Sequence, residues 1–248
     1  MPTALILVVP KLWNTVLILM RSTDDVEPFI ELTRKVVLSA RFANVPYFIM
    51  IGGCGSLYVP GLGDGHTTAV DYPEFWRAFS NLMADSEAML HYMEHALGHM
   101  GRELRKLGEA RKSRAEGKAT RAELDTIAAY EKMTMEGDEG LSFVRAARAS
   151  FMFFDGVTSF KWSYASPPPG YRPGRRTGEY KTSLDVLPLE PVGADIKDLD
   201  DKMLGITTSD MAVAVVDEAE KKTKTWKHWT AVGSVAPDIP FHTYARLQ

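Results

Sequence analysis

The stretch PYFIMIGGCGS, residues 46–56, decides the fold class, because it joins an apolar run directly to a glycine-rich turn. Residues 46–51 are continuously apolar, which is typical of a strand covered on both faces. An amphipathic helix is predicted before this strand, over about 25–42, and a short strand before that helix, at 16–20. Strand, helix and strand form a βαβ unit, which predicts parallel pairing with a right-handed crossover.

Strands and helices alternate along the rest of the chain. Further strands are predicted at 3–9, 160–165, within 180–189 and, as a final edge strand, at 226–232. Further helices are predicted at 73–98, 120–135 and 139–154, and a last helix is predicted with Thr208 or Ser209 as its capping residue. This alternation predicts a single α/β domain over 1–248, with a parallel sheet and helices on both faces. We expect the charged helical stretch of about 98–138 to be an insertion that lies over the sheet edge or over a ligand cleft.

Two helix starts carry the pattern of a capping box, in which a side chain at the helix start and a glutamate three residues later satisfy each other's backbone amides. Asp71 with Glu74 is the first pair, and Pro73 between them suits the first helical turn. Thr120 with Glu123 is the second pair. The loop at 166–178 is rich in proline and glycine, so it is predicted to have no regular structure.

Composition restricts the classes of function. The formal net charge is −3 over 248 residues, which gives no electrostatic reason to expect a nucleic-acid partner. The apolar segment 4–20 is interrupted by Pro10, Lys11 and Asn14, so it does not predict a membrane span. Cys54 is the single cysteine, which excludes an intrachain disulfide and fits the reducing cytoplasm.

Three histidines follow one another at four-residue steps on a predicted helix: His91, His95 and His99. Spacing of this kind can bind a metal ion. The glutamate of the zinc-protease pattern is not at its position, and no third ligand is evident, so solvated helix histidines are the favoured interpretation and no metal site is predicted.

Two stretches resemble a known family, namely IGGCGSLYVP at 51–60 and SPPPGYRPGRRTGEYK at 166–181. Together with the helix pattern at 206–218, they resemble the NmrA-like, NAD(P)-binding atypical short-chain dehydrogenases, and in particular the fungal averufin-oxidase-like branch. The resemblance covers the chain from about residue 25 to its end. It implies a Rossmann-like fold, NAD or NADP as cofactor, and a small or aromatic secondary metabolite of polyketide type as substrate.

The chain departs from that family at two places. No G-x-x-G-x-x-G turn is present to hold the cofactor phosphates. By the resemblance, the strand at 3–9 looks like the family's fourth strand, so we expect a Rossmann-like parallel sheet lacking its N-terminal strands, with a long helical insertion. No tyrosine is followed four residues later by lysine, so the usual proton-transfer pair of the superfamily is absent and the catalytic residues stay unassigned.

Ligands of open α/β sheets bind at the carboxyl ends of the strands, so candidate residues are taken from there. The expected cofactor-binding residues are Val9, Pro10, Gly52, Gly53, Cys54, Ser166, Pro167 and Pro168. The expected substrate-binding residues are Ser56, Tyr171 and Arg176. The two glycines either admit a ring against the backbone or form a tight turn, and Cys54 is either a reactive thiol or a small buried hydrophobe.

Three hypotheses about function follow. The chain is an NAD(P)-binding oxidoreductase-like protein, a cofactor-free regulatory or binding module of the NmrA-like kind, or a truncated and inactive member of the family. Binding of a nicotinamide nucleotide separates the first hypothesis from the other two.

Overall fold

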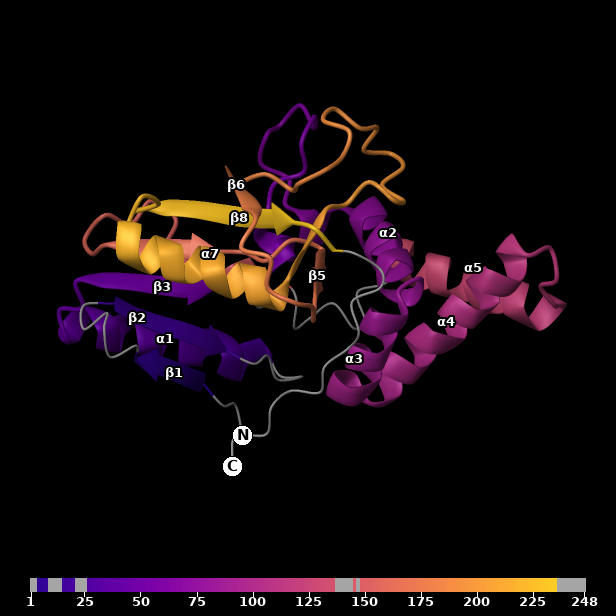
Figure 1. Ribbon diagram of the computed structural model, residues 1–248, viewed down its shortest axis with the longest axis horizontal. Helices are drawn as coiled ribbons and strands as arrows, with labels where there is room; N and C mark the ends of the chain where they lie inside the picture. The colour runs from indigo at the N-terminus through magenta and orange to yellow at the C-terminus, as the bar shows by residue number, and fades with distance from the viewer. Residues whose placement is uncertain (1–3, 9–14, 21–25, 137–144, 146–147, 236–248) are drawn as a thin grey trace.

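The computed structural model of the protein describes residues 4–8, 15–20, 26–136, 145 and 148–235 (Figure 1). A six-stranded sheet forms its centre. In spatial order the strands are β1 (Ala4–Val8), β2 (Thr15–Met20), β3 (Tyr47–Ile51), β4 (Trp162–Ala165), β8 (Lys227–Gly233) and β6 (Tyr180–Leu184). The four central strands, β2, β3, β4 and β8, run parallel, which confirms the predicted α/β fold class.

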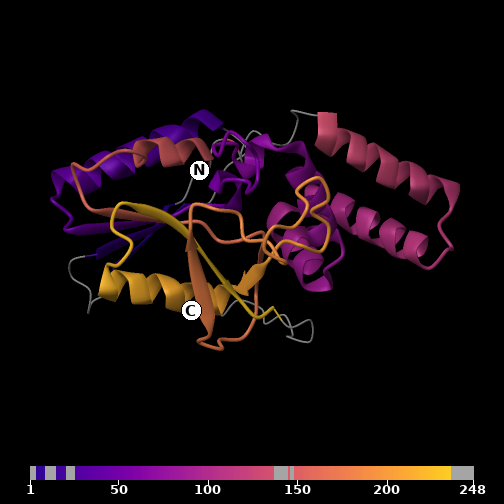
Figure 2. The same ribbon diagram turned by 90° about the horizontal axis from the view of Figure 1, so that it is seen from above.

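Helices cover both faces of this sheet, as the views of Figures 1 and 2 show. The helices are α1 (Val26–Phe42), α2 (Pro73–Ala84), α3 (Glu87–Leu97), α4 (His99–Ala115), α5 (Arg121–Glu136) and α7 (Thr208–Lys221). On β3, Phe48 and Met50 face α1, whereas Tyr47 and Ile49 face α7. Both sets of side chains are buried, which explains why β3 is apolar at every position.

The predicted βαβ unit is present as β2, α1 and β3, with β2 and β3 parallel. β1 differs from the prediction of an all-parallel sheet, because it pairs with β2 in the antiparallel direction. A parallel crossover needs about a dozen residues or more, and only residues 9–14 separate the two strands. The length of this connection is therefore the physical reason for the antiparallel pair.

The prediction that the last strand lies at a sheet edge is wrong. β8 lies between β4 and β6, and the antiparallel strand β6 occupies the edge. Burial explains the order: Trp229 and Ala231 are fully buried against α7, whereas Lys181 to Leu184 of β6 are exposed. The polar strand takes the edge, where one side of its backbone is open to solvent.

The helix predicted at 73–98 is two helices, because the chain turns between Asp85 and Ser86. Ser86 has extended backbone angles and precedes α3, while the Asp85 carboxylate binds Arg111 of α4 at 2.7 Å. Aspartate and serine bind nearby groups in non-helical conformations, so both favour helix ends over helix interiors. Sequence periodicity alone did not reveal this break.

The capping predictions had mixed outcomes. Thr120 and Glu123 form the expected capping box at the start of α5, with the Thr120 amide donating to Glu123 at 2.7 Å. The box predicted for Asp71 and Glu74 is wrong, because Tyr72 precedes α2 and no side chain caps it. Asp71 instead accepts from the hydroxyl of Thr68, whereas Pro73 does occupy the first turn.

The start of α7 lies one residue earlier than predicted. The capping residue is Thr207, whose hydroxyl oxygen accepts from the Asp210 amide at 3.1 Å. The proline-rich loop also contains the short strand β5 (Gly170–Arg172), which the sequence did not predict and which pairs in parallel with β7 (Gly205–Thr207). Half of the helix predicted at 139–154 lies outside the described residues; residues 145, 148 and 149 are helical as predicted, and Ser150–Phe153 form a 3-10 turn.

The helical insertion does not lie over the sheet edge. Helices α4 and α5 pack on α2 and α3 and extend away from the sheet (Figures 1 and 2). Leu104 and Leu107 of α4 are buried in this contact, so the charged stretch has an apolar face as well as a solvated one. Within the part of the chain that the structure describes, no helix has the length and apolar character that crossing a bilayer requires.

Candidate functional site

The carboxyl ends of the parallel strands form the candidate site. Directly after β3, the Gly52 amide donates to Ala165 at the end of β4, at 2.8 Å. Directly after β4, the Ser166 amide donates to Trp229 of β8 at 2.8 Å. These two bonds align the chain segments that leave the sheet. The first segment continues into a 3-10 turn, Cys54–Ser56, which brings the Ser56 side chain over the strand ends.

Three polar side chains meet at this edge. The Ser166 hydroxyl lies 2.9 Å from Nε2 of His228 and 2.9 Å from the Ser56 hydroxyl. The Ser56 hydroxyl lies 3.1 Å from the same Nε2 atom and also donates to the Gly53 carbonyl at 2.9 Å. Each of the three side chains is at most 2% exposed. We call Ser56, Ser166 and His228 the edge cluster.

Aromatic rings enclose the histidine of the edge cluster. The Phe151 ring centroid lies 4.5 Å from that of His228, and the Tyr164 ring meets it edge-on at 5.4 Å. Nδ1 of His228 is buried without a hydrogen-bond partner, and the nearest carboxylate oxygen of Asp185 lies 3.5 Å away. Asp185 follows β6 directly and its side chain is 45% exposed, so it stands between the buried ring and solvent.

Tyr164 does not replace the missing acid–base tyrosine. Its hydroxyl lies 2.8 Å from the Ser150 hydroxyl. Burial raises the pKa of Tyr164 to about 12, although the hydrogen bond with Ser150 opposes part of that rise. With its pKa raised to that value, the hydroxyl keeps its proton at neutral pH.

The two glycines after β3 differ. A Cβ atom on Gly52 would meet the Tyr164 ring at 2.2 Å, so Gly52 is required by packing against that ring. A Cβ atom on Gly53 would meet no atom within 4 Å. The backbone of Gly53 is extended, with φ −145° and ψ 161°, so any residue type can adopt it. Gly53 therefore leaves open space beside the edge cluster, whereas Gly52 does not.

Cys54 behaves as a small hydrophobe. It packs against the apolar cluster around Leu57 and Phe75. Burial raises the pKa of its thiol to about 12, so the reactive thiolate form is disfavoured at neutral pH. Of the two interpretations open from the sequence, the structure supports the apolar one.

The other predicted site residues are distributed over several places. Pro167 and Pro168 are buried directly after Ser166. Tyr171 packs with the buried residues under α7, on the opposite face of the sheet from the His228 ring. Arg176 is exposed in the loop after β5. Val9 and Pro10 lie outside the described residues.

The loop that carries Arg176 is held by one carboxylate. The buried side chain of Asp210 accepts from the amides of Thr177 and Gly178 and from the Thr177 hydroxyl, each at 2.8 Å. Burial alone would raise the pKa of Asp210, but these hydrogen bonds outweigh it and lower the pKa. Thr177 and Gly178 belong to the stretch at 166–181 and Asp210 belongs to the helix pattern at 206–218. The two sequence features are therefore in direct contact.

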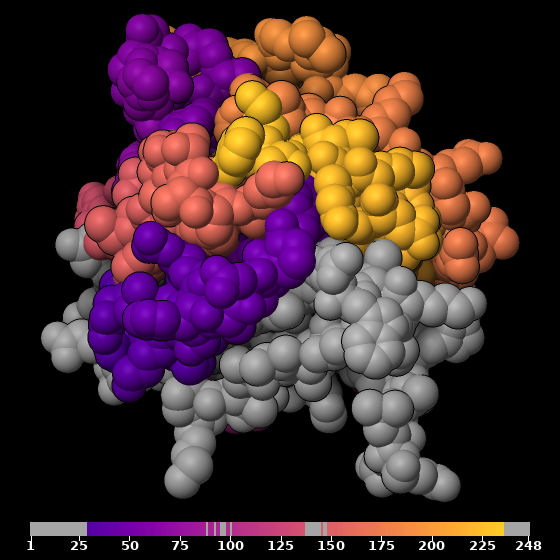
Figure 3. Space-filling view, turned by 90° about the vertical axis from the view of Figure 1, so that its left-hand side faces the viewer, coloured from indigo at the N-terminus to yellow at the C-terminus, as the bar shows by residue number. Residues whose placement is uncertain are grey.

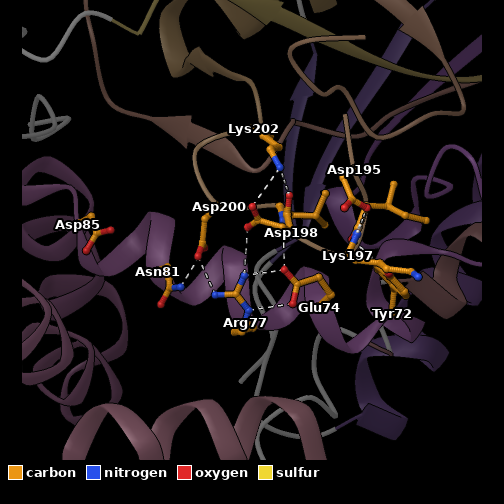
Figure 4. Close-up of polar contacts among 12 residues, drawn as sticks. Tyr72, Glu74, Arg77, Asn81, Asp85, Asp195, Lys197, Asp198, Asp200 and Lys202 are labelled. Atoms are coloured by element: carbon orange, nitrogen blue, oxygen red, sulfur yellow. Dashed lines mark hydrogen bonds and ion pairs between the residues drawn. The ribbon is translucent and has the colours of Figure 1, made fainter. Parts of the chain in front are cut away.

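A second polar group lies behind the edge, where α2 meets the acidic loop at 190–203 (Figure 4). Arg77 donates to both oxygens of Glu74 and to Asp200, the last at 2.7 Å. Glu74 also accepts from the Leu199 amide at 3.1 Å. The carboxylates are thus neutralised by Arg77 and by backbone amides, and within the described ranges no group of acidic, cysteine and histidine residues suits a metal ion. This network is a structural clamp that anchors the acidic loop.

The opposite edge of the sheet, formed by the amino ends of the parallel strands, carries a cavity of about 160 Å³ at the end of α7, lined in part by Glu218 and Lys224. Figure 3 looks onto this amino edge, where side chains of α1, of the segment after 148 and of the end of α7 gather. The Tyr47 hydroxyl donates to the buried Glu218 carboxylate there. Burial and this carboxylate raise the pKa of Tyr47, which keeps its proton. The pairing is structural and leaves the carboxyl edge as the candidate site.

Comparisons with known proteins agree with this architecture. No protein-family model and no curated protein sequence matches the chain. Among solved structures, a Bacteroides thetaiotaomicron protein described as an epimerase matches with a TM-score of 0.50 and 18% identity, over 90% of this chain and 68% of that one. A Streptococcus pneumoniae protein described as an NADH-flavin reductase matches with a TM-score of 0.50 and 14% identity, over 86% and 69%.

The likeness to these two structures shows the fold, which is the Rossmann-like α/β fold expected from the sequence. The chain spans about two thirds of the length of the structures it matches. Of the edge cluster, the sequence pointed to Ser56 and Ser166 but missed His228. The one signal that could have found His228 is its position inside the apolar strand WKHWTAV, where a buried histidine needs a polar partner.

Proposed function

We propose that the protein binds NAD or NADP at the carboxyl edge of its sheet and acts as an oxidoreductase of the reductase or epimerase kind on a small organic substrate. The observation that carries this proposal is the edge cluster, which places three groups able to exchange protons beside the open position at Gly53. A bound nicotinamide supplies or accepts hydride, and the chain's own residues hold the substrate and exchange the proton.

The residues at the edge fit the nicotinamide end of such a cofactor. Gly53 offers backbone without a side chain and with free space, which allows a planar ring to approach closely. His228 leaves one buried nitrogen without a hydrogen bond, and a catalytic role is one explanation for such a group. The pyrophosphate end has no comparable cradle in the sequence, because the G-x-x-G-x-x-G turn is missing. We therefore expect weaker binding than a complete Rossmann domain provides.

The substrate class rests on the resemblance to the averufin-oxidase-like branch. It indicates a small or aromatic secondary metabolite of polyketide type, and the exposed Arg176 offers a cation for a phenolate or carboxylate. The single cysteine favours the cytoplasm as the compartment.

A second candidate function is a cofactor-free binding or regulatory module. The observation in its favour is the burial of all three members of the edge cluster, each at most 2% exposed. Such burial is also what a purely structural polar network requires. The two candidates differ in one property, which is affinity for a nicotinamide nucleotide.

Titration of the purified chain with NADPH and with NADH, followed by nicotinamide fluorescence, tests the proposal. We expect saturable binding of one of them with a dissociation constant on the order of micromolar. Circular dichroism provides the control for folding. A folded protein that binds neither nucleotide at millimolar concentration would refute the oxidoreductase proposal and leave the cofactor-free module.

A further inference from the structure

We propose that His228 is the proton-relay group of this site, passing a proton through Ser166 and Ser56 to a substrate at Gly53, and that Asp185 is its positioning residue. The inference rests on the proposed function and deepens it by assigning the acid–base residue. His228 and the hydroxyl groups of Ser166 and Ser56 would take the role of the tyrosine–lysine pair, which the chain lacks.

The number of hydrogens available in the edge cluster supports a proton on Nε2 of His228. Four contacts need a hydrogen: Ser56 with Gly53, Ser56 with Ser166, and each serine with Nε2. Each hydroxyl supplies one hydrogen. If Nε2 carries none, two hydrogens serve four contacts; if it carries one, a continuous chain forms from Nε2–H to Ser166, to Ser56 and to the Gly53 carbonyl.

The other ring nitrogen faces a carboxylate. With a hydrogen on Nε2, Nδ1 either presents a bare lone pair to Asp185 at 3.5 Å or is protonated and attracted to it. A lone pair against a carboxylate is repulsive, and a charged N–H is attracted to it. A hydrogen on Nδ1 therefore fits this geometry, and in the proposed relay Asp185 holds the ring in position and offsets, from the solvent side, the cost of a charge on the buried ring.

Asp185 is the main source of negative charge next to the His228 ring. Among the described residues, Tyr164 meets the ring edge-on, and its pKa of about 12 keeps it neutral. Asp155 and Arg148 lie near Asp185, since all three charges act on Tyr58: burial and the two carboxylates raise the pKa of Tyr58, and Arg148 lowers it. Asp185 is the carboxylate in direct range of Nδ1, so its removal is the sharpest change available.

One proton moves in the proposed step. Ser56 gives its hydrogen to the alkoxide oxygen formed when a carbonyl substrate is reduced by NAD(P)H. Ser166 then gives its hydrogen to Ser56, and Nε2 of His228 gives its hydrogen to Ser166. A neutral imidazole remains, with its Nδ1–H directed at Asp185, and the reverse reaction returns the proton by the same path.

The backbone provides a matched pair of variants. Asp185 has φ 59° and Asp201 has φ 58°, so both lie in the left-handed region that asparagine tolerates well. Asp185→Asn removes the charge beside His228. Asp201→Asn makes the same substitution at nearly the same φ angle, but removes an exposed charge in the acidic loop. Ser166→Ala breaks the relay itself. All three variants avoid truncation of the buried histidine.

Nitrogen-15 NMR of the histidine rings, recorded from pH 5 to 9, reads the charge on His228 without any need for turnover. We expect Asp185→Asn to move the two ring-nitrogen chemical shifts of His228 toward those of a neutral ring, and Asp201→Asn to leave them at their wild-type values. The pH profile of NADPH-dependent reduction of menadione, an aromatic quinone, should change in Asp185→Asn and stay as in wild type in Asp201→Asn, and Ser166→Ala should slow the reaction.

The inference is overturned if Asp185→Asn and Asp201→Asn give the same His228 ring-nitrogen shifts and the same pH profile of the reaction. Failure of the proposed function appears elsewhere, as absence of NADPH binding by the wild-type protein. The nucleotide titration and the NMR titration therefore report on the two claims separately.

Discussion

Nε2 of His228 lies 2.9 Å from the hydroxyl of Ser166, although 62 residues separate them in the sequence. The contact crosses from β8 to the turn that follows β4, and these strands are neighbours in the sheet. The register pairs Tyr164 with His228, so the end of β4 lies beside the first half of β8, and His228 reaches the serine just after β4. The chemistry of the edge is thus a consequence of strand order.

Gly52→Ala should destabilise the protein. The added methyl group would meet the Tyr164 ring at 2.2 Å, and overpacking of this kind costs about 1–3 kcal/mol of the free energy of unfolding. Denaturant unfolding measures the change. Gly53→Ala, one residue later and in open space, is the matched control and should change the free energy of unfolding by less than about 0.5 kcal/mol. Equal losses in both variants would contradict the assigned packing.

Arg77→Met should loosen the contact between α2 and the acidic loop. The Arg77 side chain is 20% exposed and satisfies Glu74 and Asp200, whose carboxylates would lose their cation. We expect a loss of about 2–3 kcal/mol in the free energy of unfolding. Arg121→Met is the control, because Arg121 is 87% exposed and its pair with Asp125 should contribute at most about 0.5 kcal/mol. A clamp role is excluded if the two substitutions cost the same.

Asp210→Asn should reveal a pH-dependent contribution to stability. The folded-state pKa of Asp210 is lowered, so its charge stabilises the fold above the unfolded-state value of about 4 and loses that effect as pH falls through the lower folded-state pKa. At pH 7 the variant should lose about 1.5–3 kcal/mol. The difference from wild type should shrink below about pH 4. A difference that is the same at pH 3 and pH 7 would show that charge is not involved.

Cys54 should resist alkylation in the folded protein. Burial raises the pKa of its thiol to about 12, so very little thiolate exists at pH 7.5. Mass spectrometry of the protein after iodoacetamide treatment, with and without urea, measures the rates. We expect the folded rate to be at least about tenfold below the rate in urea. Similar rates would restore the reactive-thiol interpretation.

The fold was largely predictable because its signals are local. The apolar residues of β3 follow one another directly, and those of α1 recur at helical spacing within one segment. Each pattern therefore indicates the buried side of its own element. The place of β8 was not predictable in this way, because it depends on whether β6 pairs outside it. The break between α2 and α3 was missed because the apolar period continues across Asp85 and Ser86.

Two of the three residues of the edge cluster, Ser56 and Ser166, were predictable from the sequence, and His228 was not. Ser56 and Ser166 follow strands, and the rule that ligands bind at carboxyl ends selects such positions. His228 lies within a strand, 172 residues from Ser56, with no motif around it. Tyr171 was selected from the same loop as Ser166, but β5 and its pairing with β7 direct it to the α7 side. Contacts that depend on which strands are neighbours in the sheet cannot be predicted from the spacing of residues within one segment.

The dissociation constant of NADPH for Gly53→Val, compared with wild type and with Gly63→Val, tests the central claim most directly. Gly53 and Gly63 both have open space where a Cβ would lie, but Gly63 is in an exposed loop away from the edge cluster. The account predicts that Gly53→Val weakens binding about tenfold or more, equivalent to about 1.4 kcal/mol, while Gly63→Val binds like wild type. Equal affinity of all three proteins for NADPH, or no binding by any of them, would contradict a cofactor site at the carboxyl edge.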